Sequence, residues 1–127
     1  MDHRKKRILV IEDDAEMRCL LKDFLEEAGY EAHSVENGSA AFGKIAKESF
    51  DLIVTDIRMP GLSGVDILPG LKKLQPRTPI IVITAFGSEE VHRRALERGA
   101  DAYLEKPIHL EEFRILLQKM TSPQETN

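Results

Sequence analysis

The sequence contains a single cysteine, Cys19, and no tryptophan. One cysteine excludes an intrachain disulfide and a zinc site built from several cysteines. Long apolar runs are also absent: no stretch approaches the length of a membrane-spanning helix. The apolar residues 8–11 that follow the charged amino terminus are too few for the core of a signal peptide. These absences predict a soluble cytoplasmic protein without a membrane partner.

Basic residues are not in excess, because the 127 residues carry a formal net charge of −4. This modest acidity argues against nucleic-acid binding as the main task of the chain, and the basic run at residues 4–7 is interpreted as a solvated end. The length suits one domain, and a composition of 42% hydrophobic residues can bury a core. We predict one domain over residues 1–121. Residues 122–127 are then a polar tail or the start of a linker.

Apolar runs of β-branched residues alternate with amphipathic stretches along the chain. Continuous runs at residues 8–11, 52–55 and 80–83, with weaker ones at 30–35 and 102–104, indicate strands that are buried on both faces. Between them, apolar residues recur at helical spacing. This alternation predicts about five βα units, which form an α/β fold with a parallel sheet covered by helices on both faces.

The third helical pattern contains the dipeptide Pro69-Gly70. Proline inside a helix removes a hydrogen bond and its ring clashes with the preceding turn. We therefore predict a short, kinked or interrupted helix between Gly64 and Leu74.

Polar side chains follow four of the predicted strands directly. They are Glu12 and Asp13, Asp56, Thr84, and Lys106. Because ligands of open α/β sheets bind at the carboxyl ends of the strands, we expect these side chains to converge. Crowded carboxylates repel one another and favour a hard cation such as Mg²⁺. A carboxylate beside Mg²⁺ and a lysine is placed to attack a phosphoryl group, which gives an aspartyl phosphate.

Four segments together resemble the receiver domain of two-component response regulators, in the expected order and over nearly the whole chain. They are Leu9–Asp14, Asp51–Gly64, Ile83–Ala85 and Tyr103–Pro107. The resemblance implies a flavodoxin-like, doubly wound fold with five parallel strands in the order 2-1-3-4-5 and about five helices. Residues 56–61 are similar to receivers attached to enhancer-binding transcription activators.

The resemblance also implies the chemical roles of the residues at the strand ends. Asp56 is expected to be the phosphoryl acceptor and, with Glu12, Asp13 and the backbone carbonyl of Arg58, to hold Mg²⁺. Asp13 is expected to bind the metal directly, whereas Glu12 acts through water. Lys106 is expected to pair with the phosphoryl group, and the bond from it to the next residue, a proline, to be cis.

Two further residues are implied to carry the signal. Thr84 is expected to donate a hydrogen bond to the phosphoryl group, and Tyr103 to occupy the aromatic switch position. The implied donor is a sensor histidine kinase or a phosphotransfer protein. The implied output is a partner or a C-terminal domain, with a homodimer through the fourth helix, fifth strand and fifth helix as an open alternative. Such a protein is a phosphoacceptor switch and not a turnover enzyme.

Other interpretations stay open at the level of the sequence. Asp14 is expected to cap the first helix, and Asp13 with Glu16 could form a capping box. Asp56 could begin a turn. The alternative functions are an aspartyl-phosphate hydrolase of the haloacid-dehalogenase type, a degenerate receiver used for binding, and a flavin or nucleotide carrier. The hydrolase requires an aspartate where Arg58 stands, and the carriers require phosphate loops that the sequence lacks. The four histidines are interpreted as surface residues.

Overall fold

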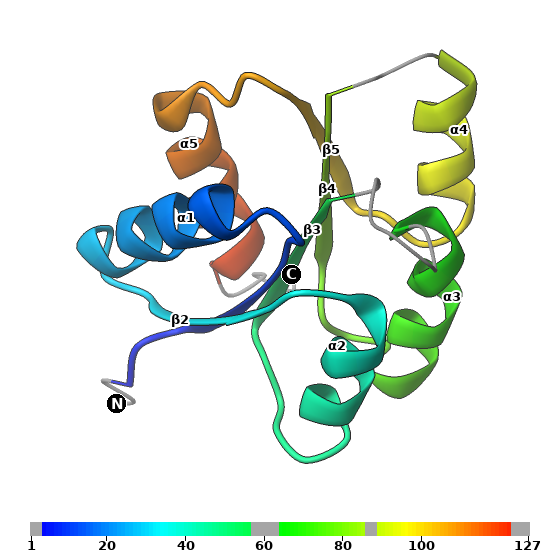
Figure 1. Cartoon of the computed structure of the whole chain (residues 1–127), viewed down its shortest axis with the longest axis horizontal. Helices are drawn as coiled ribbons and strands as arrows, with labels where there is room; N and C mark the ends of the chain where they lie inside the picture. Colours follow the sequence, from blue (N-terminus) through cyan, green and yellow to red (C-terminus); the bar gives the residue numbers. More distant parts are fainter. Residues whose placement is uncertain (1–3, 57–63, 86–88, 123–127) are drawn as a thin grey trace, which may run out of the picture.

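Strands and helices alternate along the chain in the computed structural model (Figure 1). The structure describes residues 4–56, 64–85 and 89–122, the side chains of 64–66 excepted. The elements are β1 (Arg7–Ile11), α1 (Ala15–Glu27), β2 (Glu31–Val35), α2 (Gly38–Ile45), β3 (Leu52–Asp56), α3 (Gly64–Leu74), β4 (Ile80–Thr84), α4 (Glu89–Glu97), β5 (Ala102–Glu105) and α5 (Leu110–Thr121). None of the described helices is long and apolar enough to cross a membrane.

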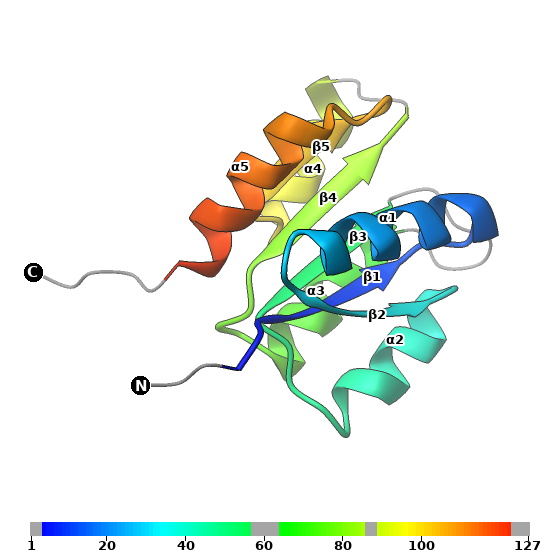
Figure 2. The same ribbon diagram turned by 90° about the vertical axis from the view of Figure 1, so that its left-hand side faces the viewer.

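The five strands form one parallel sheet in the order β2-β1-β3-β4-β5. This order confirms the predicted flavodoxin-like topology. Asp56 pairs with Ile83, and Thr84 pairs with Glu105, so β3, β4 and β5 end close to one level. In Figure 2 the arrowheads of the strands point toward the same end of the molecule. The register therefore gathers the residues that follow the strands at one edge.

Helices cover both faces of the sheet, with α1 and α5 on one side and α2, α3 and α4 on the other (Figure 1). Successive strand residues face opposite sides, so Ile8 and Val10 pack toward α1 and α5. Leu9 and Ile11 belong to the second core, which includes residues of α2, α3 and α4. All four of these β1 residues are 0% exposed. This two-sided burial explains why the sequence of β1 is continuously apolar rather than alternating.

Local caps and turns begin and end the helices. Asp14 precedes α1, and its carboxylate accepts a hydrogen bond from the backbone N–H of Met17 at 3.3 Å. The predicted cap at Asp14 is confirmed, and the alternative capping box of Asp13 with Glu16 is wrong, because Asp13 lies one residue too early. Gly29 ends the turn after α1 with a φ of 100°, a conformation that glycine adopts without a steric penalty.

The helix α3 runs from Gly64 to Leu74 without a break at Pro69. Of the predicted alternatives, the interrupted helix is therefore wrong, whereas a kink stays a prediction. Pro69 is exposed and costs the helix one backbone hydrogen bond, whereas Leu68 and Leu71 on the other face are fully buried against the sheet. Gly70 lies beside Phe42 of α2, and a Cβ atom at position 70 would come within 2.8 Å of the Phe42 ring. The dipeptide thus permits close packing between α2 and α3.

Candidate functional site

The carboxyl ends of β1, β3 and β5 bring together three of the predicted site residues. Glu12 follows β1 directly, Asp56 is the last residue of β3, and Lys106 follows β5 directly. The ammonium nitrogen Nζ of Lys106 donates to Oδ2 of Asp56 at 2.7 Å and to Oε1 of Glu12 at 3.4 Å. The lysine therefore bridges two carboxylates that come from different strands.

Asp13 completes a cluster of three carboxylates with Glu12 and Asp56. One carboxylate oxygen of each residue lies within 4.8 Å of the others. Glu12 and Asp56 are buried, whereas Asp13 is exposed and opens the cluster to solvent. Three oxygen donors without nitrogen or sulfur suit a hard divalent cation that keeps several water ligands. Arg58, whose carbonyl was predicted as a further ligand, lies outside the described residues.

Burial and crowding favour the protonated form of Glu12. Its side chain is only 3% exposed, and this burial, reinforced by the charge of Asp56, raises the pKa of Glu12 to about 7. A hydrogen bond from the backbone N–H of Asp14 and the charge of Lys106 act in the opposite direction. The raised pKa of Glu12 thus reflects first its burial and then its proximity to Asp56.

Lys106 is held in its charged form by the same carboxylates. Burial alone would lower the pKa of Lys106, but hydrogen bonds to Asp56 and Glu12 and their charges outweigh burial and raise it. The backbone N–H of Lys106 donates to the carbonyl of Thr84 at 2.8 Å, which fixes the start of the loop after β5. The Lys106–Pro107 bond is cis, as predicted.

Thr84 and Tyr103 lie on adjacent strands next to this cluster. Thr84 ends β4, between β3 and β5 in the sheet, and is 0% exposed. Tyr103 lies in β5, and its ring packs against the core on the side of α2, α3 and α4. The ring stacks on the imidazole of His92, with centroids 4.1 Å apart and an interplanar angle of 11°. The structure thus places Thr84 at the end of β4, next to the strand that ends at Asp56, and Tyr103 on the neighbouring strand β5 against α4.

His92 is the neighbour of the site that the sequence analysis missed. It was interpreted as a surface residue, and it is exposed, but one ring face covers Tyr103. A signal was available, because His92 lies one helical turn before Ala95, which is fully buried. That spacing places both residues on neighbouring parts of the helix face that meets the sheet.

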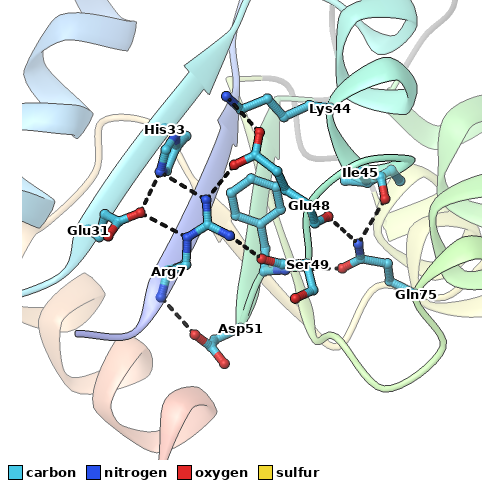
Figure 3. A network of polar contacts seen from close by, with 10 residues as sticks. Arg7, Glu31, His33, Lys44, Ile45, Glu48, Ser49, Asp51 and Gln75 are labelled. Carbon is cyan, nitrogen blue, oxygen red and sulfur yellow. Dashed lines mark hydrogen bonds and ion pairs between the residues drawn. The ribbon is translucent and has the colours of Figure 1, made fainter. Parts of the chain in front are cut away.

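A second polar cluster lies at the amino end of the strands (Figure 3). The guanidinium group of Arg7 donates to Glu31 at 2.8 Å, to Glu48 at 2.5 Å and to the carbonyl of Ser49 at 2.7 Å. The group also lies 4.8 Å from the centre of the Phe50 ring. The interpretation of residues 4–7 as a solvated end is therefore wrong for Arg7. Its contacts tie β1 to β2 and to the connection before β3, so its role is structural.

Comparisons with known proteins point in one direction. Residues 8–118 match the model of the response regulator receiver domain family. The chain is 36% identical, over 93% of its length, to the DNA-binding transcriptional regulator NtrC of Bradyrhizobium sp.. It is 37% identical, over 80% of its length, to the transcriptional regulatory protein ResD of Bacillus subtilis. These alignments span 25% and 42% of the two relatives.

The solved structures show the same likeness. A receiver domain protein (CheY-like) from Methanospirillum hungatei superposes with a TM-score of 0.87 at 32% identity, covering 92% of this chain and 94% of that one. The family match favours a receiver over the hydrolase and carrier alternatives of the sequence analysis. The convergence of Glu12, Asp13, Asp56 and Lys106 further argues against a receiver that has lost its site.

Proposed function

Because the chain belongs to the response regulator receiver domain family, whose members are phosphoacceptor switches, we propose that Asp56 is its phosphoryl acceptor. The observation that supports this role most directly is the 2.7 Å contact between Asp56 and Lys106 beside two further carboxylates. Asp56 is 6% exposed, whereas Asp13 beside it is exposed to solvent. A carboxylate held in this way is oriented before the donor arrives.

The proposed reaction is the transfer of a phosphoryl group from a phosphohistidine. A carboxylate oxygen of Asp56 forms a bond to phosphorus while the bond from phosphorus to the imidazole nitrogen of the donor breaks. The leaving nitrogen keeps the electron pair and takes a proton from solvent. The Lys106 ammonium then pairs with an oxygen of the transferred group, and the hydroxyl of Thr84 donates to another.

Mg²⁺ is the cation that fits the oxygen donors of Glu12, Asp13 and Asp56. When bound, it neutralises charge on the carboxylates and on the phosphoryl oxygens. The exposed Asp13 is proposed as a direct ligand, and the buried Glu12 as a ligand acting through water. The carbonyl of Arg58 is proposed as a further ligand.

Receiver domains interact with histidine kinases, and such a kinase or a phosphotransfer protein is the proposed donor. The acyl phosphate adds about 1.5 to 2 negative charges at the site and biases the domain toward a second conformation. We place the readout on the surface of α4, β5 and α5, where a C-terminal output domain or a second copy of the chain would bind. The domain is then a switch and not a turnover enzyme.

A small acyl phosphate tests the assignment. Incubation of the protein with this donor and Mg²⁺ should add one phosphoryl group to the intact mass, and a metal chelator should prevent the addition. The Asp56→Asn variant should gain nothing, whereas Asp23→Asn, a matched change on the exposed part of α1, should behave as the parent does. Full labelling of the folded Asp56→Asn variant would assign the acceptor to another residue.

A further inference from the structure

The stacking of His92 on Tyr103 joins α4 to β5. The two ring centroids lie 4.1 Å apart and the rings are within 11° of parallel. Tyr103 is half-buried, with its other contacts on the core under α4. His92 therefore covers the outer face of a ring whose inner part faces the sheet. Aromatic pairs in this range attract one another beyond the effect of their buried area.

The hydroxyl group of Tyr103, unlike the ring, makes no stabilising polar contact among the described residues. Its oxygen atom is buried and has no hydrogen-bond partner among the residues that the structure describes. A buried hydroxyl without a partner has lost its hydration and opposes the buried position of the ring. Consistently, burial together with the charge of Glu105 raises the pKa of the phenol.

A hollow next to the Tyr103 ring offers space for a second position of this side chain. A surface hollow of about 440 Å³ lies between α4 and the start of α5, and its lining includes His92, Tyr103, Glu105, His109 and Glu112. The lining carries polar groups and is open to solvent. A phenol that turned into this hollow would recover hydration for its hydroxyl group, at the cost of the stack on His92.

We propose that His92 is the positioning residue that keeps the Tyr103 ring buried in the unmodified domain. The stacking contact with His92 offsets the free-energy cost of burying the hydroxyl group without a partner. His92 therefore sets the equilibrium between a buried and a solvent-facing Tyr103 ring. The consequence of this role for signalling rests on the proposed function, in which Tyr103 is the switch residue. His92 then determines how many unmodified molecules already have the ring buried before Asp56 receives a phosphoryl group.

The ionisation of the Tyr103 phenol measures its position without any phosphoryl donor. The chain has two tyrosines and no tryptophan, so Tyr30→Phe leaves Tyr103 as the one phenol that absorbs when it ionises. Alkaline titration by ultraviolet absorbance, with circular dichroism at each pH to verify the fold, then gives the pKa of Tyr103. A ring that merely loses its cover without moving keeps its hydroxyl group buried and its pKa raised.

Three variants are compared in this background. His92→Ala removes the stack, and the ionisation constant of Tyr103 should rise about threefold or more as the hydroxyl becomes hydrated. His92→Phe preserves a planar ring and should restore the parental value. Arg93→Ala, at the next exposed position of α4, should leave the value unchanged.

An unchanged ionisation constant in His92→Ala would overturn the inference, as would a failure of His92→Phe to restore the parental value. If the ionisation constant of Tyr103 rose as much in Arg93→Ala as in His92→Ala, the cause would be a general loosening of α4. This result would also overturn the inference. Phosphoryl uptake by the same variants is followed separately by intact mass. Failure of Asp56 to accept a phosphoryl group would thus be distinguishable from failure of His92 to hold the ring.

Discussion

The Nζ atom of Lys106 lies 2.7 Å from Oδ2 of Asp56, although the two residues are 50 positions apart in the sequence. The sheet creates this contact, since β3 and β5 flank β4 on either side and end at the same edge. The same lysine reaches Glu12 at 3.4 Å. The ammonium group of Lys106 thus contacts two buried carboxylates at once.

Replacement of Lys106 by methionine should slow phosphoryl transfer while leaving the metal site largely intact. The ammonium group would contact charge that develops on the phosphoryl oxygens, and loss of one such contact lowers a rate by about a hundredfold. The initial rate of mass gain from a small acyl phosphate measures the effect. Lys73→Met, on the exposed part of α3, is the matched control. Equal rates in the Lys106 variant and the parent would remove Lys106 from the proposed reaction.

Asp13 should contribute more to Mg²⁺ binding than its neighbour Asp14. Asp13 belongs to the carboxylate cluster, whereas Asp14 caps α1. A bound cation stabilises the folded state, by about 2.7 kcal/mol when its concentration is a hundred times the dissociation constant. In thermal melts, Mg²⁺ should therefore raise the Tm of the parent. It should also raise the Tm of Asp14→Asn, since asparagine also caps helices. If Asp13→Asn gained as much stability from Mg²⁺ as Asp14→Asn, the assignment of Asp13 would be wrong.

Glu31 should contribute to stability above its ordinary pKa of 4.5 and lose that contribution in acid. Hydrogen bonds with His33 and Arg7 lower the pKa of Glu31 to about 2 in the folded protein. The unfolded chain therefore binds the proton more readily, and stability falls as the pH drops from about 4.5 toward 2. Urea unfolding of the parent and Glu31→Gln should differ at pH 7 and converge as the pH falls. A stability difference that did not change with pH would contradict this account.

Two glycine-to-alanine substitutions should have different effects. Gly43 of α2 has open space around its Cβ direction among the described residues, so alanine there should stabilise the helix by about 0.5–1 kcal/mol. At Gly70 the added methyl group would come within 2.8 Å of the Phe42 ring, and the ring would have to shift. Denaturant unfolding should place Gly70→Ala below Gly43→Ala in stability. The reverse order would refute the proposed packing between α2 and α3.

The strand order was predicted from the resemblance to receiver domains. The meeting of Glu12, Asp13, Asp56 and Lys106 was predicted from the residues themselves, because each stands after an apolar run. A parallel sheet brings such positions to one edge whatever the surrounding side chains are. The cap at Asp14 was predictable for a similar reason, since it depends only on residues within one helical turn.

The contacts of His92 and Arg7 were not predicted, because they depend on where long or planar side chains turn after the helices have packed. Arg7 looked like part of a basic end, yet acceptors from β2 and from the connection to β3 surround it. The interruption of α3 at Pro69 was wrongly predicted. The local cost of this proline was recognised, but the buried contacts of Leu68 and Leu71 that hold α3 on the sheet are tertiary.

Chemical mapping of the modified residue tests the central claim most directly. Borohydride reduces an aspartyl phosphate to homoserine, so the protein is treated with a small acyl phosphate and Mg²⁺, reduced and digested, and its peptides are sequenced by mass spectrometry. The account predicts homoserine at position 56, and none there when the donor is omitted. Homoserine at another aspartate, with position 56 unchanged in a folded sample, would contradict it.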